Sequence, residues 1–253
     1  MAKTYGEVFA KVYSKMWGEF SERVAPAVID FYEFESGARE GVILDVCCGT
    51  GHFAKYVLDR GYGLIGVDLS ENMLKYALES CEEYVENSRA KFLLGDASDF
   101  GIDTEVDLAV LMYDSLNHLE SFEKLKGCFV SVNRALRSGG FFIFDLNTKK
   151  GLRDNWNSVH LFNNEEITVL NRGFFLEDEN MALTKITGFV KNETGLYERF
   201  DETIKNTVFD LNAVKEALLA RGFSEVYFSS LPDFNRKEDF PDEGNRSFII
   251  ARK

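Results

Sequence analysis

The residues with the clearest chemical character are residues 42–54, which read VILDVCCGTGHFA. This segment is an apolar strand that ends in Asp45, followed by a turn of small residues and the start of a helix. Cys47, Gly49 and Gly51 let the backbone of the turn approach a ligand closely. Because a helix start directs unpaired N–H groups at such a ligand, the segment predicts a site for a nucleotide-containing cofactor.

Two classes of cofactor are compatible with this turn. The spacing Gly49-x-Gly51-x-x-Ala54, with Asp68 after a second strand, fits the fingerprint of NAD-dependent oxidoreductases. Asp45 argues against NAD, because a carboxylate beside the turn repels a diphosphate. The same carboxylate would attract a ligand that carries an ammonium group and a sulfonium.

Acidic residues end three strands of the expected sheet. Asp45 and Asp68 end the first two, and Asp96, which is followed by Ala97, ends the third. The carboxyl ends of parallel strands meet at one edge of a sheet, where α/β proteins bind their ligands. The three carboxylates are therefore expected in one cleft, with Asp96 placed to accept a hydrogen bond from an adenine amino group.

Five blocks follow one another along the chain: LDVCCGTG at 44–51, GVDLSENML at 66–74, GDASDF at 95–100, VDLAVLMYDSLNHL at 106–119 and LRSGGFFIFDLN at 136–147. In this order they make the chain resemble the class I S-adenosylmethionine-dependent methyltransferases, in the branch that modifies small molecules. The resemblance covers residues 40–150. One position departs from the family, since Cys47 stands where the first glycine of the turn usually lies.

The resemblance implies S-adenosyl-L-methionine as the cofactor, and the family's contacts carry over to the matching positions. Asp45, Cys47 and Gly49 would serve the methionine end of the cofactor, and Gly51 would shape the turn. Asp68 would bind the ribose hydroxyls. The remaining expected cofactor contacts are Leu69, Met73, Asp96, Ala97 and Tyr113.

Short apolar runs alternate with helical stretches between residues 42 and 146, which predicts parallel strands joined by right-handed crossovers. Strands are expected at 42–47, 63–68, 91–95, 106–111 and 140–146, and helices at 51–60, 71–87 and 121–137. Two helices are expected between Tyr5 and Phe34, and Ser70 is expected to cap a helix. With the resemblance, the expected fold is α/β and Rossmann-like, with a doubly wound, mostly parallel seven-stranded sheet and an antiparallel C-terminal strand.

The texture of the sequence changes after Asn147 to short alternating segments separated by turn residues, such as EDEN at 177–180. This pattern predicts an inserted antiparallel β subdomain of four to six strands at residues 152–209. Residues 1–151 and 210–253 then form the cofactor-binding core. The insertion is expected to act either as a substrate lid or as a dimer contact.

Candidate catalytic residues follow the fourth strand in the segment YDSLNHL. Tyr113, Asn117 and His118 are polar and are expected to face the transferred methyl group. His118 is a candidate general base for a hydroxyl or a protonated amine, since imidazole titrates near neutral pH. The alternative is a structural His118, hydrogen-bonded beneath the loop. Methyl transfer depends more on alignment than on strong acid–base groups, so it does not require a base.

Four residues are candidates for contact with the substrate: Tyr13, Trp156, Tyr197 and Arg199. Arg199 could pair with a substrate carboxylate, or with the neighbouring Asp201. Trp156 could instead anchor packing. Tyr5 and Tyr13 lie on an aromatic helix that either docks on the core or covers the cofactor.

Composition limits the partners of the chain. A net charge of -13 disfavours nucleic acids, whose binding depends on Lys and Arg. The four cysteines form no CxxC pair and there are only three histidines, so no metal site is expected. No apolar run suggests a signal peptide or a membrane span. We therefore expect a cytoplasmic monomer or homodimer that acts on a small-molecule methyl acceptor.

The leading functional hypothesis is a methyltransferase that passes the methyl group of S-adenosylmethionine in line to oxygen or nitrogen of a small metabolite. One alternative is an NAD-dependent oxidoreductase, motivated by the glycine spacing and Asp68. Another is a regulatory protein that binds S-adenosylmethionine without turnover, motivated by the lack of a compelling base and by Cys47. The identity of the acceptor is not encoded in any motif.

Overall fold

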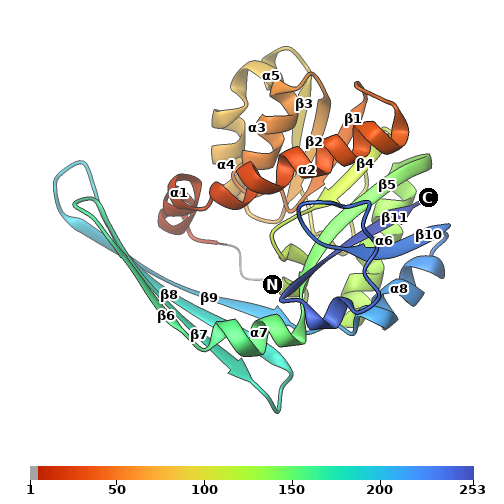
Figure 1. The fold of residues 1–253 in the computed structure, drawn as a ribbon. Coiled ribbons are helices and arrows are strands. Elements are labelled where there is room, and N and C mark those ends of the chain that lie inside the picture. Colours follow the sequence, from red (N-terminus) through yellow and green to blue (C-terminus); the bar gives the residue numbers. More distant parts are fainter. Residues whose placement is uncertain (1–4) are drawn as a thin grey trace.

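The apolar runs of the sequence form a seven-stranded sheet in the computed structural model, which describes residues 5–253 (Figure 1). Its strands are β1 (Val42–Val46), β2 (Gly63–Asp68), β3 (Ala90–Leu94), β4 (Val106–Leu111), β5 (Leu136–Asn147), β10 (Glu225–Ser229) and β11 (Arg246–Arg252). They lie in the order β10-β11-β5-β4-β1-β2-β3. Strands β1 to β5 are parallel, and β11 is antiparallel to both neighbours, which confirms the expected fold class.

Helices cover both faces of this sheet (Figure 1). The helices within residues 5–253 are α1 (Glu7–Met16), α2 (Glu19–Ser36), α3 (His52–Asp59), α4 (Glu71–Ser80), α5 (Glu82–Glu86), α6 (Phe122–Ala135), α7 (Lys149–Trp156) and α8 (Leu211–Leu219). Short 3₁₀ helices η1 (Ser115–His118) and η2 (Pro241–Glu243) complete the set. Helices α6 and α8 pack on one face, and α2 and α3 pack on the other.

Two predicted boundaries are wrong. The helix expected at 71–87 is divided at Cys81, whose backbone is not helical and whose carbonyl accepts the N–H groups that start α5. The strand expected at 140–146 starts earlier, because β5 pairs with β4 from Leu136 across a register shift. Both errors reflect backbone hydrogen bonds to residues outside the local pattern.

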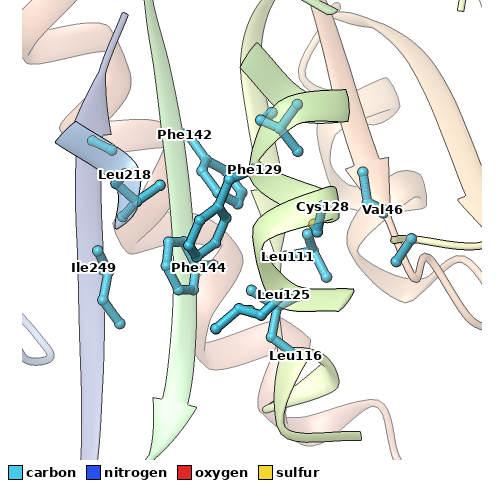
Figure 2. Close-up of a cluster of buried hydrophobic side chains, with 14 of the residues drawn as sticks. Val46, Leu111, Leu116, Leu125, Cys128, Phe129, Phe142, Phe144, Leu218 and Ile249 are labelled. Carbon is cyan, nitrogen blue, oxygen red and sulfur yellow. The ribbon is translucent and has the colours of Figure 1, made fainter. Parts of the chain in front are cut away.

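The core under α6 is built from aromatic side chains of β5 (Figure 2). The ring of Phe129 in α6 lies 6.2 Å from that of Phe142 and 5.8 Å from that of Phe144. Phe142 and Phe144 sit two positions apart on the strand, so their side chains share one face. This packing holds β5 in place and fixes the position of the strand end that reaches the candidate site.

The insertion forms a second sheet of four antiparallel strands. These are β6 (Val159–Asn163), β7 (Ile167–Leu176), β8 (Met181–Lys191) and β9 (Tyr197–Thr207). Figure 1 shows this sheet extending away from the core, with α1 beside it. Phe9 of α1 packs with Met73 of α4 and Phe200 of β9 in one buried cluster, so α1 joins the two sheets. Among residues 5–253 no helix is both long and apolar enough to span a bilayer.

Replacing Phe129 with Ala should lower the free energy of unfolding by about 3–5 kcal/mol, because the deletion leaves a cavity among fully buried rings. Its neighbour Val130 is 44% exposed on the same helix, and Val130→Ala should change stability by no more than about 0.5 kcal/mol. Urea unfolding followed by far-UV circular dichroism measures both. Equal effects of the two substitutions would contradict the assigned packing of α6.

Candidate functional site

The turn after β1 has the left-handed backbone that its small residues permit. Cys47, Gly49 and Gly51 have φ angles of 59°, 54° and 84°. A Cβ atom on Gly51 would lie 3.1 Å from the Cα of Ala77 in α4, so this glycine is needed for close packing of α3 on α4. Cys47 adopts the conformation that glycine would favour, at the cost of strain.

The residues of the turn face different surroundings. A Cβ atom on Gly49 would meet only the ring of Tyr13, at 3.8 Å. The side chain of Cys47 lies in the field of all three predicted acids, Asp68, Asp45 and Asp96. Burial raises the pKa of the Cys47 thiol, and those carboxylates raise it further. The charges of the three acids thus act on one side chain of the turn, which is consistent with their expected position at the same edge of the sheet.

Asp45 is the most unusual of these acids. It is 3% exposed, and its Oδ2 atom has no hydrogen-bond partner among the described residues. Burial raises the pKa of the Asp45 carboxyl group, and repulsion from Asp68 adds to the shift. A buried carboxylate oxygen without a donor is costly unless a ligand supplies one. The ammonium group at the methionine end of S-adenosylmethionine fits this requirement.

Asp68 connects the end of β2 to the turn. The N–H of Gly49 donates to Asp68 Oδ2 at 2.8 Å, and the N–H of Ser70 donates to Oδ1 at 2.9 Å. Burial raises the pKa of Asp68 despite these bonds. Each carboxylate oxygen can accept a further hydrogen bond, so the residue fits the predicted contact with ribose hydroxyls.

The residues predicted to contact the adenine differ in how accessible they are to a ligand. Asp96 Oδ1 accepts hydrogen bonds from the backbone and hydroxyl of Ser98, which leaves Oδ2 for a ligand. Leu69 is 38% exposed, whereas Met73 is buried in the cluster with Phe9. The structure thus offers Leu69 as a free apolar surface and gives Met73 a packing role.

Ser70 caps α4 as expected. Its hydroxyl accepts the N–H of Met73 at 3.3 Å. Ala97, which follows Asp96, is buried in the core, so only its backbone is suited to a ligand contact.

Helix α1 closes one side of the site. The ring of Tyr13 stacks on Trp17 with centroids 5.4 Å apart. Burial raises the pKa of the phenols of Tyr5 and Tyr13, and the charges of Asp68 and Asp114 contribute to both shifts. The N–H of Gly6 donates to Glu202 of β9 at 3.0 Å, so the second sheet holds the start of α1.

The loop after β4 carries the candidate catalytic residues. Tyr113 and Asp114 have left-handed φ angles of 66° and 49°. The Tyr113 ring stacks on Phe20 of α2 with centroids 4.6 Å apart. Asp145, at the end of β5, accepts the N–H groups of Tyr113 and Asp114 at 2.7 and 2.9 Å. A buried carboxylate therefore fixes this loop.

His118 is placed as a potential base. Its side chain is 33% exposed, and its Nε2 atom lies 3.9 Å from Asp114 Oδ2. The imidazole makes no hydrogen bond to another residue within 5–253. Burial lowers the pKa of His118, and the carboxylate of Asp114 partly opposes this effect. An imidazole with a lowered pKa is neutral at physiological pH and able to accept a proton.

Asn117 is wrongly predicted as a catalytic residue. It is completely buried, and its side-chain amide donates to the carbonyls of Asn147 and Thr207. Its Oδ1 atom accepts the N–H of Asn147 at 2.9 Å. With its polar atoms occupied, Asn117 ties η1 to the ends of β5 and β9 and cannot meet an acceptor.

Tyr197 and Arg199 are also wrongly predicted as substrate contacts. Side chains alternate along β9, and these two lie on the face opposite Phe200 and Glu202, which approach α1. Arg199 makes two hydrogen bonds to Asp201, as its alternative interpretation proposed.

Trp156 anchors packing between α7 and the second sheet. Its indole N–H donates to the hydroxyl of Thr184 in β8 at 2.8 Å. The structure therefore supports the packing alternative for this residue. Tyr13 is thus the one of the four substrate candidates that lies beside the turn.

A groove of about 870 Å³ opens next to the loop after β4. Phe20 and Arg246 line it, and both also contact the ring of Tyr113. This volume falls in the range of small-molecule sites. No group of metal-ligating side chains occurs within residues 5–253.

Three residues of the site were missed from the sequence: Asp145, Glu202 and Arg246. Asp145 lies third from the end of the strand block LRSGGFFIFDLN, so a search for acids close to strand ends could have found it. Glu202 and Arg246 have no such local signal, because their partners lie far away in the chain.

Replacing Asp45 with Asn should raise the Tm of the ligand-free protein by about 2–4 °C near neutral pH, the change expected for about 1 kcal/mol in a chain of this size. The raised pKa means that ionised Asp45 opposes folding above its unfolded-state pKa. The gain should shrink as the pH falls toward that value.

Differential scanning calorimetry between pH 5 and 8 would measure this difference. Asp103→Asn is the matched control, since it removes the same charge from an exposed position. A lower Tm for Asp45→Asn at every pH would show that Asp45 is not strained in the ligand-free protein.

The chain is similar to known methyltransferases. A family model described as a methyltransferase domain matches residues 43–140, from β1 into β5. The Bacillus subtilis protein YqeM, which carries a provisional methyltransferase name, is 29% identical over 225 residues, covering 88% of this chain and 84% of its own length.

An N,N-dimethyltransferase of Streptomyces venezuelae named for dTDP-3-amino-3,4,6-trideoxy-alpha-D-glucopyranose is 25% identical over 195 residues, 75% of this chain and 78% of its own. The crystal structure of an S-adenosylmethionine-dependent methyltransferase from Clostridium acetobutylicum has the same fold, with a TM-score of 0.77 and 22% identity over 96% of this chain and 97% of that one.

These matches replace the NAD-dependent oxidoreductase interpretation, and they favour an enzyme over a non-catalytic regulator. The unpaired Asp45 carboxylate is consistent with them, since a sulfonium ligand with an ammonium group suits it and a diphosphate does not. Residues 43–140 thus match a methyltransferase domain, and the chain as a whole is similar in sequence and fold to S-adenosylmethionine-dependent methyltransferases.

Proposed function

We propose that the enzyme methylates a nitrogen atom of a small amine metabolite. The observation that carries this proposal is the pairing of Asp114 with His118 on the loop after β4, beside the rings of Tyr113 and Phe20. A carboxylate and aromatic faces attract a protonated amine, and the imidazole can take up its proton. An alcohol would gain little from the carboxylate.

Charge around the loop supports a cationic acceptor. The carboxylates of Asp114 and Asp145 both form ion pairs with Arg246, so these three side chains together carry a net charge of about -1 when both acids are ionised. An acceptor that carried only negative charge would be repelled by this arrangement.

The chain's own residues position and deprotonate the acceptor. S-adenosylmethionine, when bound, supplies a methyl group on a sulfonium, which is electrophilic. Asp45, Gly49 and Asp68 would hold the cofactor in the cleft. His118 accepts a proton from the ammonium of the acceptor, which frees the nitrogen lone pair for attack, and Asp114 stabilises the resulting imidazolium. Alignment of the two reactants contributes most of the acceleration, in keeping with the lack of stronger acid–base groups.

The second sheet acts in this proposal as a lid. Its inner face presses α1 onto the cofactor cleft through Phe200 and Glu202, which limits the access of water. Crosslinking in solution would test the alternative role of residues 152–209 as a dimer contact. The amino-sugar N,N-dimethyltransferase among the relatives supports a nitrogen acceptor of metabolite size.

The acidic composition and the cysteines support the rest of the proposal. A net charge of -13 argues against nucleic-acid substrates. All four cysteines are free thiols, which favours a reducing compartment such as the cytoplasm.

Incubation of the purified protein with S-adenosylmethionine and a panel of small amines, each matched by its hydroxyl analogue, tests the proposal. We expect S-adenosylhomocysteine to accumulate with at least one amine and not with its analogue. Asp68→Ala should abolish this signal by loss of cofactor binding. Turnover of hydroxyl compounds alone would replace the amine with an oxygen acceptor.

His118→Gln should lower kcat for the amine by about 10²–10⁴, the usual contribution of a general base, while the Kd of S-adenosylmethionine stays within twofold. In the unmodified enzyme the rate should fall on the acid side, as His118 takes up a proton. Because burial lowers its pKa, this fall should lie below the pH at which an ordinary histidine titrates. His160→Gln, an exposed position in β6, is the control, and a flat acid limb would count against the base.

A further inference from the structure

The loop after β4 is held by residues from the far end of the chain. Asp145 in β5 is completely buried and accepts the N–H groups of both Tyr113 and Asp114. These two residues have left-handed backbones without being glycine, a conformation that persists only where neighbouring groups impose it. The carboxylate of Asp145 supplies that constraint.

Arg246 completes the arrangement from β11. It pairs with Asn147 across the antiparallel ladder, which puts its side chain diagonally beside that of Asp145 on the same face. Its Nη1 atom donates to Asp145 Oδ2, and its Nη2 atom donates to Asp114 Oδ1 at 2.8 Å. The guanidinium also lies 4.8 Å from the centre of the Phe20 ring.

The two oxygen atoms of the Asp114 carboxylate have different neighbours. One oxygen, Oδ1, is held by Arg246, and the other, Oδ2, lies 3.9 Å from His118 Nε2. Without the guanidinium, the carboxylates of Asp114 and Asp145 would face each other as like charges, and Asp114 would be free to rotate. The orientation of Asp114 toward His118 therefore depends on a residue that is 132 positions away in sequence.

We propose that Arg246 and Asp145 are positioning residues, which hold Tyr113 and Asp114 so that one Asp114 oxygen faces His118 and the acceptor. The effect on turnover rests on the proposed function, whereas the effect on His118 does not. When Arg246 alone is replaced, the bonds from the Tyr113 and Asp114 N–H groups to Asp145 remain, so methyl transfer should be impaired while cofactor binding stays intact.

Arg246→Gln tests this proposal by two measurements. The kcat for an amine that the unmodified enzyme methylates should fall about 10–100-fold, while the Kd of S-adenosylmethionine, from calorimetry, stays within twofold. Arg246→Lys should recover part of the loss, since one ammonium can hold a single carboxylate. Arg252→Gln on the same strand is the control, because that side chain lies over Phe141 and away from the loop.

The second measurement is the titration of His118 by NMR, which requires no acceptor. The chain has three histidines, and the His118→Gln spectrum identifies the signal. Asp114 is the charged group whose field acts on His118, with Arg246 and Asp145 behind it. The His118 midpoint should therefore move in Arg246→Gln and stay in place in Arg252→Gln.

The two measurements distinguish the positioning role of Arg246 from the proposed amine acceptor. An unchanged His118 midpoint in Arg246→Gln, or kcat and cofactor affinity that fall together, would overturn the positioning role. A shifted midpoint in an enzyme that methylates no amine would support the positioning role and reject the proposed acceptor. If Arg246→Gln does not fold, Asp114→Asn replaces it, and removal of the carboxylate should lower the His118 pKa.

Discussion

A buried carboxylate without a partner is the constraint around which this site is organised. Asp45 lies at the end of a central strand, inside the sheet, where water cannot solvate its charge and Asp68 repels it. A fold tolerates such a group when its ligand supplies the missing cation. The left-handed turn keeps the backbone close to this carboxylate, and α1 covers one side of the turn. Affinity for the sulfonium cofactor and strain in the ligand-free protein thus have one physical origin.

The two sheets meet through α1, and this connection links binding with substrate access. The helix has no extensive core of its own, and its buried residues pack with Met73 on one side and with Phe200 on the other. These contacts and the bond from Gly6 to Glu202 connect the cofactor side of the core to the second sheet, and Asn117 connects the loop after β4 to the end of β9. The Asp145 network shows the same principle at the acceptor side, where strand ends from distant parts of the chain fix one loop.

Local sequence was more informative for the cofactor side of the candidate site than for the acceptor side. The turn and the acids at the ends of β1 to β3 follow from strand periodicity and from where parallel strands end, so Asp45, Asp68 and Asp96 could be placed in one cleft. Asn117 looked catalytic because its partners, Asn147 and Thr207, are remote in sequence. The prediction that Tyr197 and Arg199 contact the substrate did not take the face of β9 into account. Which face meets α1 depends on the register of the whole sheet, and periodicity alone does not fix that register. Arg246 had no local signal at all.

The cysteine that replaces the first glycine of the turn is itself a nucleophile, and it could compete with the acceptor for the methyl group. A thiolate reacts far more readily with alkylating agents than a thiol does. Burial and three surrounding carboxylates raise the pKa of Cys47, so its sulfur stays protonated at neutral pH. The carboxylates expected to bind a positively charged methyl donor would thereby also keep the neighbouring sulfur in its less reactive form.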